Sequence, residues 1–147
     1  MRCISMKKAL LVGAVGCGKT TFRQRIFGQK QTYDKTQAIE FFDSLIDTPG
    51  EFTEHRRLYS ALNVTANQAD VIVMMQSVKD KRQIFSPGFS YMFYKPAVGV
   101  ITKTDLAESQ EDLDYVEKQL KLAGAEQIFT ISSKTNQGVD TLIKYLE

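Results

Sequence analysis

The segment Gly13–Thr20, with the sequence GAVGCGKT, constrains this chain more than any other feature. It fits the phosphate-binding loop (P-loop) pattern G-x-x-x-x-G-K-[ST] at every fixed position. The run 9–12 before it is apolar and predicts a buried strand, and residues 21–27 after it predict a helix. Strand, glycine loop and helix in this order let backbone N–H groups surround phosphate oxygens at a helix N-terminus. The segment therefore predicts a site for a nucleoside triphosphate.

Each polar residue of the loop has a predicted task. The Lys19 amine would reach the β- and γ-phosphates, and the Thr20 hydroxyl would ligate Mg²⁺. The residues predicted to bind the phosphates are Gly13, Gly16, Cys17, Gly18, Lys19, Thr20, Thr21 and, from a later segment, Gly50. The alternative for the loop is a glycine-rich turn that matches the pattern by chance, which the flanking strand and helix disfavour.

Hydrophobic patterning predicts an α/β fold. Apolar runs at 71–75, 97–101 and 128–131 lack polar alternation, which is typical of parallel strands covered on both faces. The residues Leu113, Val116, Leu120 and Ala123 fall on one helix face, with Ser109 and Asp112 as an N-terminal cap and Gly124 as a C-terminal stop. A last helix follows at 139–146, and residues 36–47 predict a short hairpin.

These elements predict one three-layer α/β domain over residues 1–147. Its sheet would have six strands, mostly parallel, with one short antiparallel edge strand. Met6 would make a natural start, so residues 1–5 are expected to be a dispensable extension. Five aromatic residues crowd into one short stretch, and core packing of an abbreviated helix is the expected reason: Phe85, Phe89, Tyr91, Phe93 and Tyr94.

Composition narrows the partners and the compartment. The chain has 147 residues and a formal net charge of +2, too small to favour nucleic acid or an anionic membrane surface. No apolar run approaches the ~18 residues of a membrane span. Cys3 and Cys17 are the only cysteines and form no C-x-x-C pair, so a reduced, cytoplasmic setting is expected.

The second group of candidate residues follows the predicted hairpin. Asp47-Thr48-Pro49-Gly50 comes at a strand end, where an acidic residue can hold the Mg²⁺ shell and a glycine N–H can approach the γ-phosphate. The alternative is a simple turn. Thr36 could complete Mg²⁺ coordination when the γ-phosphate is present, or it could be an ordinary threonine at a strand entry. The predicted metal ligands are therefore Thr20, Thr36 and Asp47.

The third group follows the last two predicted strands. The Asp105 carboxylate can accept from both N1–H and the 2-amino group of guanine, a donor pair that adenine lacks. The Lys103 side chain would lie along the base, and the Ser132–Lys134 segment could present a backbone N–H to guanine O6. The predicted base-binding set is Thr102, Lys103, Asp105, Ser133 and Lys134.

Together these motifs, in this order, resemble the G domain of small P-loop GTPases. A closer resemblance, to the EutP/PduV family of ethanolamine and propanediol utilisation, lies in segments 33–40, 46–51, 56–62 and 85–89. That family implies a G-domain-like fold and a link to bacterial microcompartments. Shell or filament proteins would then be partners, with the protein in the cytoplasm or associated with a microcompartment.

Two positions depart from the small-GTPase pattern. Thr102 stands where Asn is common, and Glu51 stands where many members have a water-orienting Gln. A glutamate could accept a proton from water but would repel the γ-phosphate, so slow hydrolysis is expected, with Lys19 and Glu51 as catalytic candidates. Three functions stay open: a Mg²⁺-dependent GTPase, an ATP-dependent phosphotransferase of acetate kinase type, and a non-catalytic adaptor stabilised by nucleotide. GTP or ATP would be the ligand.

Overall fold

A six-stranded sheet forms the centre of the molecule. The computed structural model describes residues 7–26, 40–41, 45–132, 134–135 and 137–146. The strands are, in spatial order, β2 (Glu40–Phe41), β3 (Leu45–Asp47), β1 (Ala9–Val12), β4 (Val71–Ser77), β5 (Ala97–Thr102) and β6 (Ile128–Thr130). All neighbours are parallel except β2 and β3, which are antiparallel. The predicted six strands and the short antiparallel edge strand are both confirmed.

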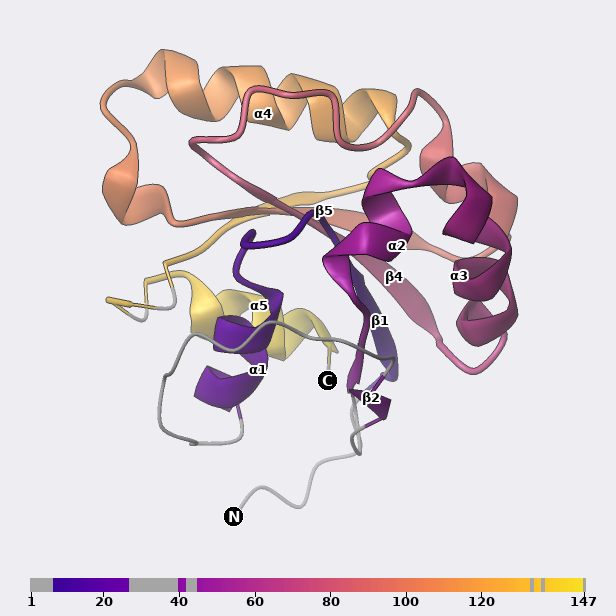
Figure 1. Cartoon of the computed structure of the whole chain (residues 1–147). Helices are drawn as coiled ribbons and strands as arrows, with labels where there is room; N and C mark the ends of the chain where they lie inside the picture. The colour runs from indigo at the N-terminus through magenta and orange to yellow at the C-terminus, as the bar shows by residue number, and fades with distance from the viewer. Residues whose placement is uncertain (1–6, 27–39, 42–44, 133, 136, 147) are drawn as a thin grey trace.

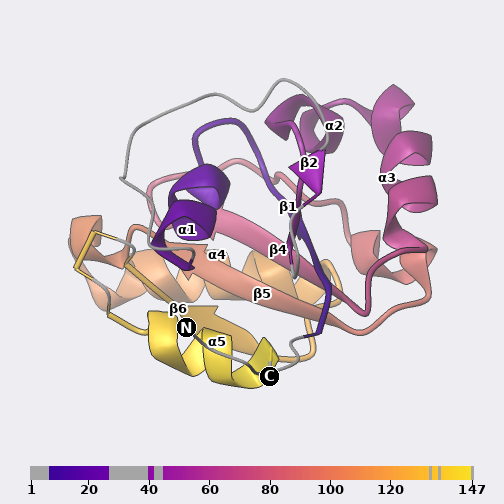
Figure 2. The ribbon, with the colours of Figure 1, turned by 90° about the horizontal axis from the view of Figure 1, so that it is seen from below.

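Helices cover both faces of this sheet (Figures 1 and 2). The α-helices are α1 (Lys19–Ile26), α2 (Gly50–Glu54), α3 (Tyr59–Ala66), α4 (Gln110–Leu122) and α5 (Val139–Leu146). Short 3₁₀ turns are η1 (Arg56–Leu58), η2 (Phe89–Phe93) and η3 (Thr104–Leu106). The helices α3 and α4 pack on one face, and α1 and α5 on the other. None of the described helices is long and apolar enough to cross a bilayer.

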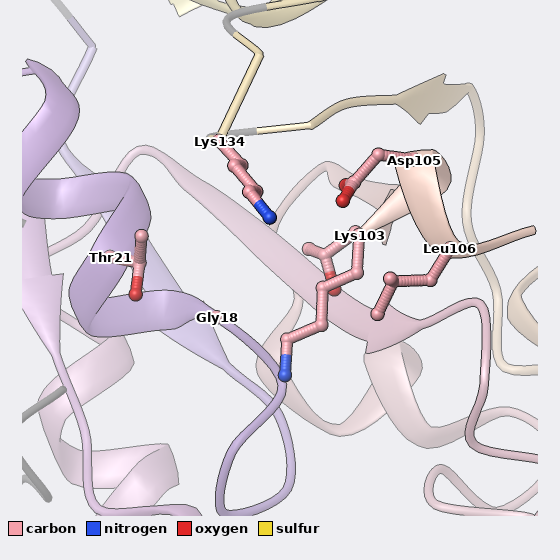
Figure 3. A pocket seen from close by; sticks show the side chains of 7 residues that line it. Gly18, Thr21, Lys103, Asp105, Leu106 and Lys134 are labelled. Carbon is pink, nitrogen blue, oxygen red and sulfur yellow. The ribbon is translucent and has the colours of Figure 1, made fainter.

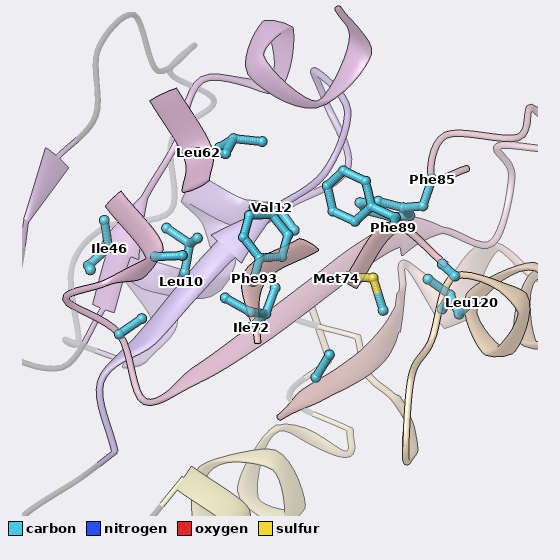
Figure 4. Packing of buried hydrophobic residues seen from close by; sticks show 14 of the residues in the cluster. Leu10, Val12, Ile46, Leu62, Ile72, Met74, Phe85, Phe89, Phe93 and Leu120 are labelled. Carbon is cyan, nitrogen blue, oxygen red and sulfur yellow. The ribbon is translucent and has the colours of Figure 1, made fainter. Parts of the chain in front are cut away.

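The central strands are apolar because both of their faces are buried. Along β1, Leu10 and Val12 join the core under α3 and α4, whereas Ala9 and Leu11 join the core under α1 and α5. All four residues are fully buried. Figure 4 shows the first of these cores around Leu10, Val12, Ile72 and Met74. The period-2 alternation of a strand thus supplies both layers, which explains the uninterrupted apolar runs.

The aromatic segment between β4 and β5 divides between core and surface. Phe89 packs its ring against Phe85 and Phe93, with ring centroids 5.0 and 5.4 Å apart, and all three are buried. Tyr91 and Tyr94, in contrast, are 71% and 94% exposed. The expectation of core packing is therefore right for the three phenylalanines and wrong for the two tyrosines.

The C-terminal end of α4 is as predicted, whereas the N-terminal cap differs from the prediction. Ser109 occupies the N-cap position, but its hydroxyl makes no capping hydrogen bond. Instead, the Asp112 carboxylate accepts from the Glu108 N–H at 3.1 Å. At the other end Gly124 has a φ of +110°, and the N–H groups of Gly124 and Ala125 donate to carbonyls in the last turn. This Schellman arrangement ends the helix at the predicted glycine.

Candidate functional site

The P-loop connects the centre of the sheet to α1. Gly16 and Gly18 have φ values of +80° and +107°, which L residues with a side chain rarely adopt. A Cβ on Gly13 would lie 2.4 Å from the Met75 carbonyl oxygen and 2.6 Å from the Cys17 Sγ, so this position has no room for a side chain. The three glycines therefore allow a loop that wraps closely over the end of β1.

Lys19 lies folded over this loop. Its amine donates to the carbonyl oxygens of Gly13 at 2.7 Å and Ala14 at 3.1 Å, and the residue is only 5% exposed. A buried ammonium needs such acceptors to offset its lost hydration. The side chain is thus already fixed at the loop, where the pattern requires a cation for phosphate oxygens.

The Asp47–Gly50 segment lies against the P-loop. Asp47 pairs with Leu11 in the β3–β1 register, and its carboxylate is fully buried. The Thr48 hydroxyl donates to the Leu11 carbonyl at 2.7 Å. A Cβ on Gly50 would lie only 2.2 Å from the Val15 backbone nitrogen. The glycine therefore allows α2 to begin directly against the loop.

The buried Asp47 carboxylate forms an ion pair with α1. The Arg23 Nε on α1 lies 3.6 Å from the Asp47 Oδ2. Among the described residues no group of three or more His, Cys, Asp or Glu side chains could hold a metal ion. Mg²⁺ instead commonly takes one or two carboxylates together with substrate phosphates and waters. A buried carboxylate one strand away from the phosphate loop fits that donor set.

The end of β5 and the residue after it are tied to the P-loop by two hydrogen bonds. The Thr102 hydroxyl donates to the Cys17 carbonyl. The Lys103 amine donates to the Gly16 carbonyl at 2.6 Å, and Lys103 itself has a left-handed φ of +57°. A left-handed backbone is costly for a lysine. The two bonds hold the end of β5 and the left-handed Lys103 backbone beside the loop.

A pocket of about 260 Å³ opens between the P-loop and this segment (Figure 3). It is lined by Gly18, Thr21, Thr102, Lys103, Asp105, Leu106 and Lys134. One side of the pocket thus comes from the predicted phosphate-binding set and the other from the predicted base-binding set. The fold brings residues more than a hundred positions apart to one cavity.

Ser132 lies in the segment predicted to present a backbone N–H to guanine O6, but the sequence did not predict the role of its side chain. Its hydroxyl donates to the Asp105 Oδ1 at 2.7 Å and accepts from the Thr135 N–H at 3.2 Å, and the residue is fully buried. Ser132 thereby fixes one carboxylate oxygen of Asp105 and leaves the other for a ligand. The signal available in the sequence was the position of Ser132 at the end of the last strand.

Some predicted residues lie outside this description. Thr36, Ser133 and residues 1–5 are not among the described residues, and the side chains of Thr20 and Glu51 are also outside the description. Their predicted roles stay predictions. Thr20 and Glu51 belong to the first turns of α1 and α2, respectively.

Comparison with known proteins places the chain in a family. Residues 6–147 match the PduV-EutP family model, described as "Ethanolamine utilisation - propanediol utilisation". The chain is 42% identical to the propanediol utilization protein PduV of Citrobacter freundii over 96% of this chain and 93% of that protein. It is 35% identical to the Escherichia coli (strain K12) protein named "Probable acetate kinase EutP", over 96% of this chain and 89% of that protein.

More distant matches include a GTPase and an elongation factor. GTPase Era of Sinorhizobium medicae is 27% identical over 92% of this chain, which spans half of Era. The crystal structure of a bacterial selenocysteine-specific elongation factor superposes with a TM-score of 0.69 at 20% identity, over 97% of this chain and 29% of that one. This likeness confirms the predicted P-loop fold of the G-domain type. By the extent of the family match and the identity to PduV, the chain belongs to the PduV-EutP family of ethanolamine and propanediol utilisation.

Proposed function

We propose that this protein is a Mg²⁺-dependent P-loop nucleoside triphosphatase that prefers GTP. The observation that carries the proposal is the pocket in which Gly18 and Thr21 of the phosphate side face Asp105 and Lys134 of the base side. A guanosine nucleotide presents phosphates at one end and a paired donor edge at the other. The name of the relative Era, a GTPase, points the same way.

In this proposal the base is selected by Asp105. Ser132 occupies the Asp105 Oδ1, so the Oδ2 and the remaining lone pairs face the ligand. A carboxylate accepts well from the N1–H and 2-amino donors of guanine, and it repels the acceptor N1 of adenine. The Lys103 stem and the Leu106 side chain line the same pocket and would contact the flat face of the base.

The phosphates would be held by the loop and the start of α1. Backbone N–H groups of Gly16 to Thr21 would donate to phosphate oxygens, and the Lys19 amine would add a positive charge. Bound Mg²⁺ would neutralise charge on the β- and γ-phosphates. Asp47, with the hydroxyls of Thr20 and Thr36, would hold its coordination shell, and the Gly50 N–H would approach the γ-phosphate.

We expect slow turnover, with Glu51 as the residue that would accept a proton from water. The sequence provides no amide at that position, and a carboxylate near a triphosphate adds repulsion. Replacing Glu51 by Ala should lower the hydrolysis rate without weakening GTP binding, because the repulsion between the carboxylate and the γ-phosphate is removed. An unchanged hydrolysis rate would remove Glu51 from the mechanism.

Competition binding tests the core of the proposal. A fluorescent guanosine diphosphate is displaced with GTP or ATP in the presence of Mg²⁺, and again after Mg²⁺ removal with a chelator. GTP should displace the probe at lower concentration than ATP, and chelation should weaken the binding of GTP. Equal displacement by both nucleotides would contradict the assignment of guanine.

A phosphotransferase of acetate kinase type is the second candidate, because the Escherichia coli relative carries that name. The test is acetyl phosphate formation from ATP and acetate. Product that disappears in Lys19→Ala would favour this function over GTP hydrolysis. Tight binding with neither hydrolysis nor transfer would instead favour a nucleotide-stabilised adaptor.

For all three functions we propose a cytoplasmic location in association with a microcompartment, with shell or filament proteins as partners. The reason is the family's link to propanediol and ethanolamine utilisation.

A further inference from the structure

We propose that Thr53 is a positioning residue that holds α2 against the P-loop and so places the Gly50 N–H for the third phosphate of a nucleoside triphosphate. The inference rests on the proposed function, since it names a residue that would set the preference of that site for triphosphate over diphosphate. Thr53 belongs to none of the motifs that indicate the site.

The first observation is a hydrogen bond between α2 and the loop. The Gly13 N–H donates to the Thr53 Oγ1 at 3.1 Å. Thr53 is 1% exposed, so water does not compete for either partner. Loss of the hydroxyl would leave the Gly13 N–H without an acceptor in a buried place, which is strongly unfavourable. The bond therefore fixes the distance between the first strand's end and α2.

The second observation is the fit between α2 and the loop backbone. A Cβ on Gly50 would lie 2.2 Å from the Val15 nitrogen and 2.7 Å from the Ala14 carbonyl carbon. Gly50 and Thr53 are three residues apart on a helix, so they lie on the same side of α2. Thr53 thus anchors the face of α2 that Gly50 presents to the loop.

Two further contacts hold the rest of α2. Phe52 packs against the core under α3 and α4. Glu54 lies 3.6 Å from the Arg82 guanidinium of the segment after β4. Because α2 has only five residues, these tertiary contacts rather than helix propensity determine its position. Among them, the Thr53 bond is the one that reaches the phosphate loop.

A diphosphate lacks the phosphate that Gly50 would contact, and this difference makes the inference testable. We compare Thr53→Val, which keeps the shape and removes the hydroxyl, with Thr53→Ser, which keeps the hydroxyl. Thr65→Val is the matched control: Thr65 is also buried, and its hydroxyl donates within α3 to the Ala61 carbonyl at 2.8 Å. The affinities for GDP and for a non-hydrolysable GTP analogue are measured by displacement of a fluorescent nucleotide.

In Thr53→Val, the affinity for the GTP analogue divided by the affinity for GDP should fall about fivefold. This is the change in affinity that corresponds to the loss of about one hydrogen bond. Thr53→Ser should restore the ratio, and Thr65→Val should leave it unchanged. An unchanged ratio in Thr53→Val, or an equal loss for both nucleotides, would overturn the inference. If the wild-type protein binds neither nucleotide, the proposed function fails instead.

Hydrogen exchange of the wild-type protein without nucleotide supplies a test that needs no variant. The amides of Gly13, Thr53 and Glu54 should be protected, because the Gly13 N–H donates to the Thr53 Oγ1 and the other two lie in the last turn of α2. Exchange of these amides at unprotected rates would overturn the inference even if Thr53→Val fails to fold.

Discussion

Replacing Asp105 by Asn is expected to weaken GTP binding about a hundredfold without weakening ATP binding, because the variant removes the repulsion between the carboxylate and the acceptor N1 of adenine. Ser132 donates to the Oδ1 of Asp105 at 2.7 Å, so in the variant the amide oxygen would remain paired with Ser132. The amide NH₂ group would then face the donor edge of guanine, donor against donor. Both hydrogen bonds from the base would be lost.

The magnitude follows from the exposure of the carboxylate. A hydrogen bond to a charged group contributes about 1.5–3 kcal/mol, and the exposed Asp105 indicates the lower end of that range. Two such bonds give about 3 kcal/mol, which corresponds to roughly a hundredfold in affinity. Inosine triphosphate, which lacks the 2-amino group, should bind the wild type about tenfold more weakly than GTP does.

The assay is displacement of a fluorescent guanosine diphosphate by GTP, inosine triphosphate and ATP, with Mg²⁺ present throughout. In the Asn variant GTP and inosine triphosphate should bind with equal, low affinity. The reasoning would be refuted if GTP bound the variant within about threefold of the wild type, or if GTP and ATP lost affinity together.

Three further predictions concern positioning and stability. Ser132→Ala should weaken the binding of GTP about tenfold in the same assay, with ATP binding as the control. The reason is the loss of the one hydrogen bond from Ser132 that orients the Asp105 carboxylate toward the base. Gly99→Ala should lower the free energy of unfolding by about 1–3 kcal/mol in denaturant titrations, because its Cβ would lie 3.0 Å from the Leu120 Cβ; unchanged stability would contradict the packing. Arg82 hydrogen-bonds Asp80 and lowers the pKa of its carboxyl. Asp80→Asn should therefore cost at most about 1 kcal/mol at pH 7, and the difference from wild type should vanish as the pH falls below the ordinary carboxyl range through the lowered pKa.

The sheet could be predicted because burial on both faces leaves a plain trace in the sequence. The runs that became β1, β4 and β5 contain little but apolar residues, and the structure extends β4 to Ser77 and β5 to Thr102. The added ends carry Gln76, Ser77 and Thr102, which are polar yet buried. Hydrophobic patterning could not include them because their burial depends on contacts that no local pattern reveals. The Gln76 side-chain nitrogen donates to the Gln119 Oε1, and the Thr102 hydroxyl donates to the Cys17 carbonyl.

The short helices α2 and α3 could not be predicted from periodicity. Five residues of α2 are too few to show a helical repeat, and α3 places only Leu62, Thr65 and Ala66 in buried positions. Their positions depend on contacts with the loop and the core, which no local pattern encodes. The side-chain hydrogen bonds of Thr53 and Ser132 could not be predicted for the same reason, since each joins a partner distant in the chain.

The motif positions were more predictable than the bonds between them. Pattern spacing placed Gly13–Thr20, Asp47 and Asp105 at strand ends, and the structure gathers them at one edge of the sheet. The donation from Lys103 to Gly16 and the left-handed backbone of Lys103 could not be read from spacing, because both arise only when β1 and β5 flank β4.

The two bonds from Thr102 and Lys103 to P-loop carbonyls join the two ends of the candidate site mechanically. The residues that would contact the base are tied to the loop that would surround the phosphates. A substitution that removes either side chain should therefore disturb nucleotide contacts at both ends of the pocket and not at the base alone.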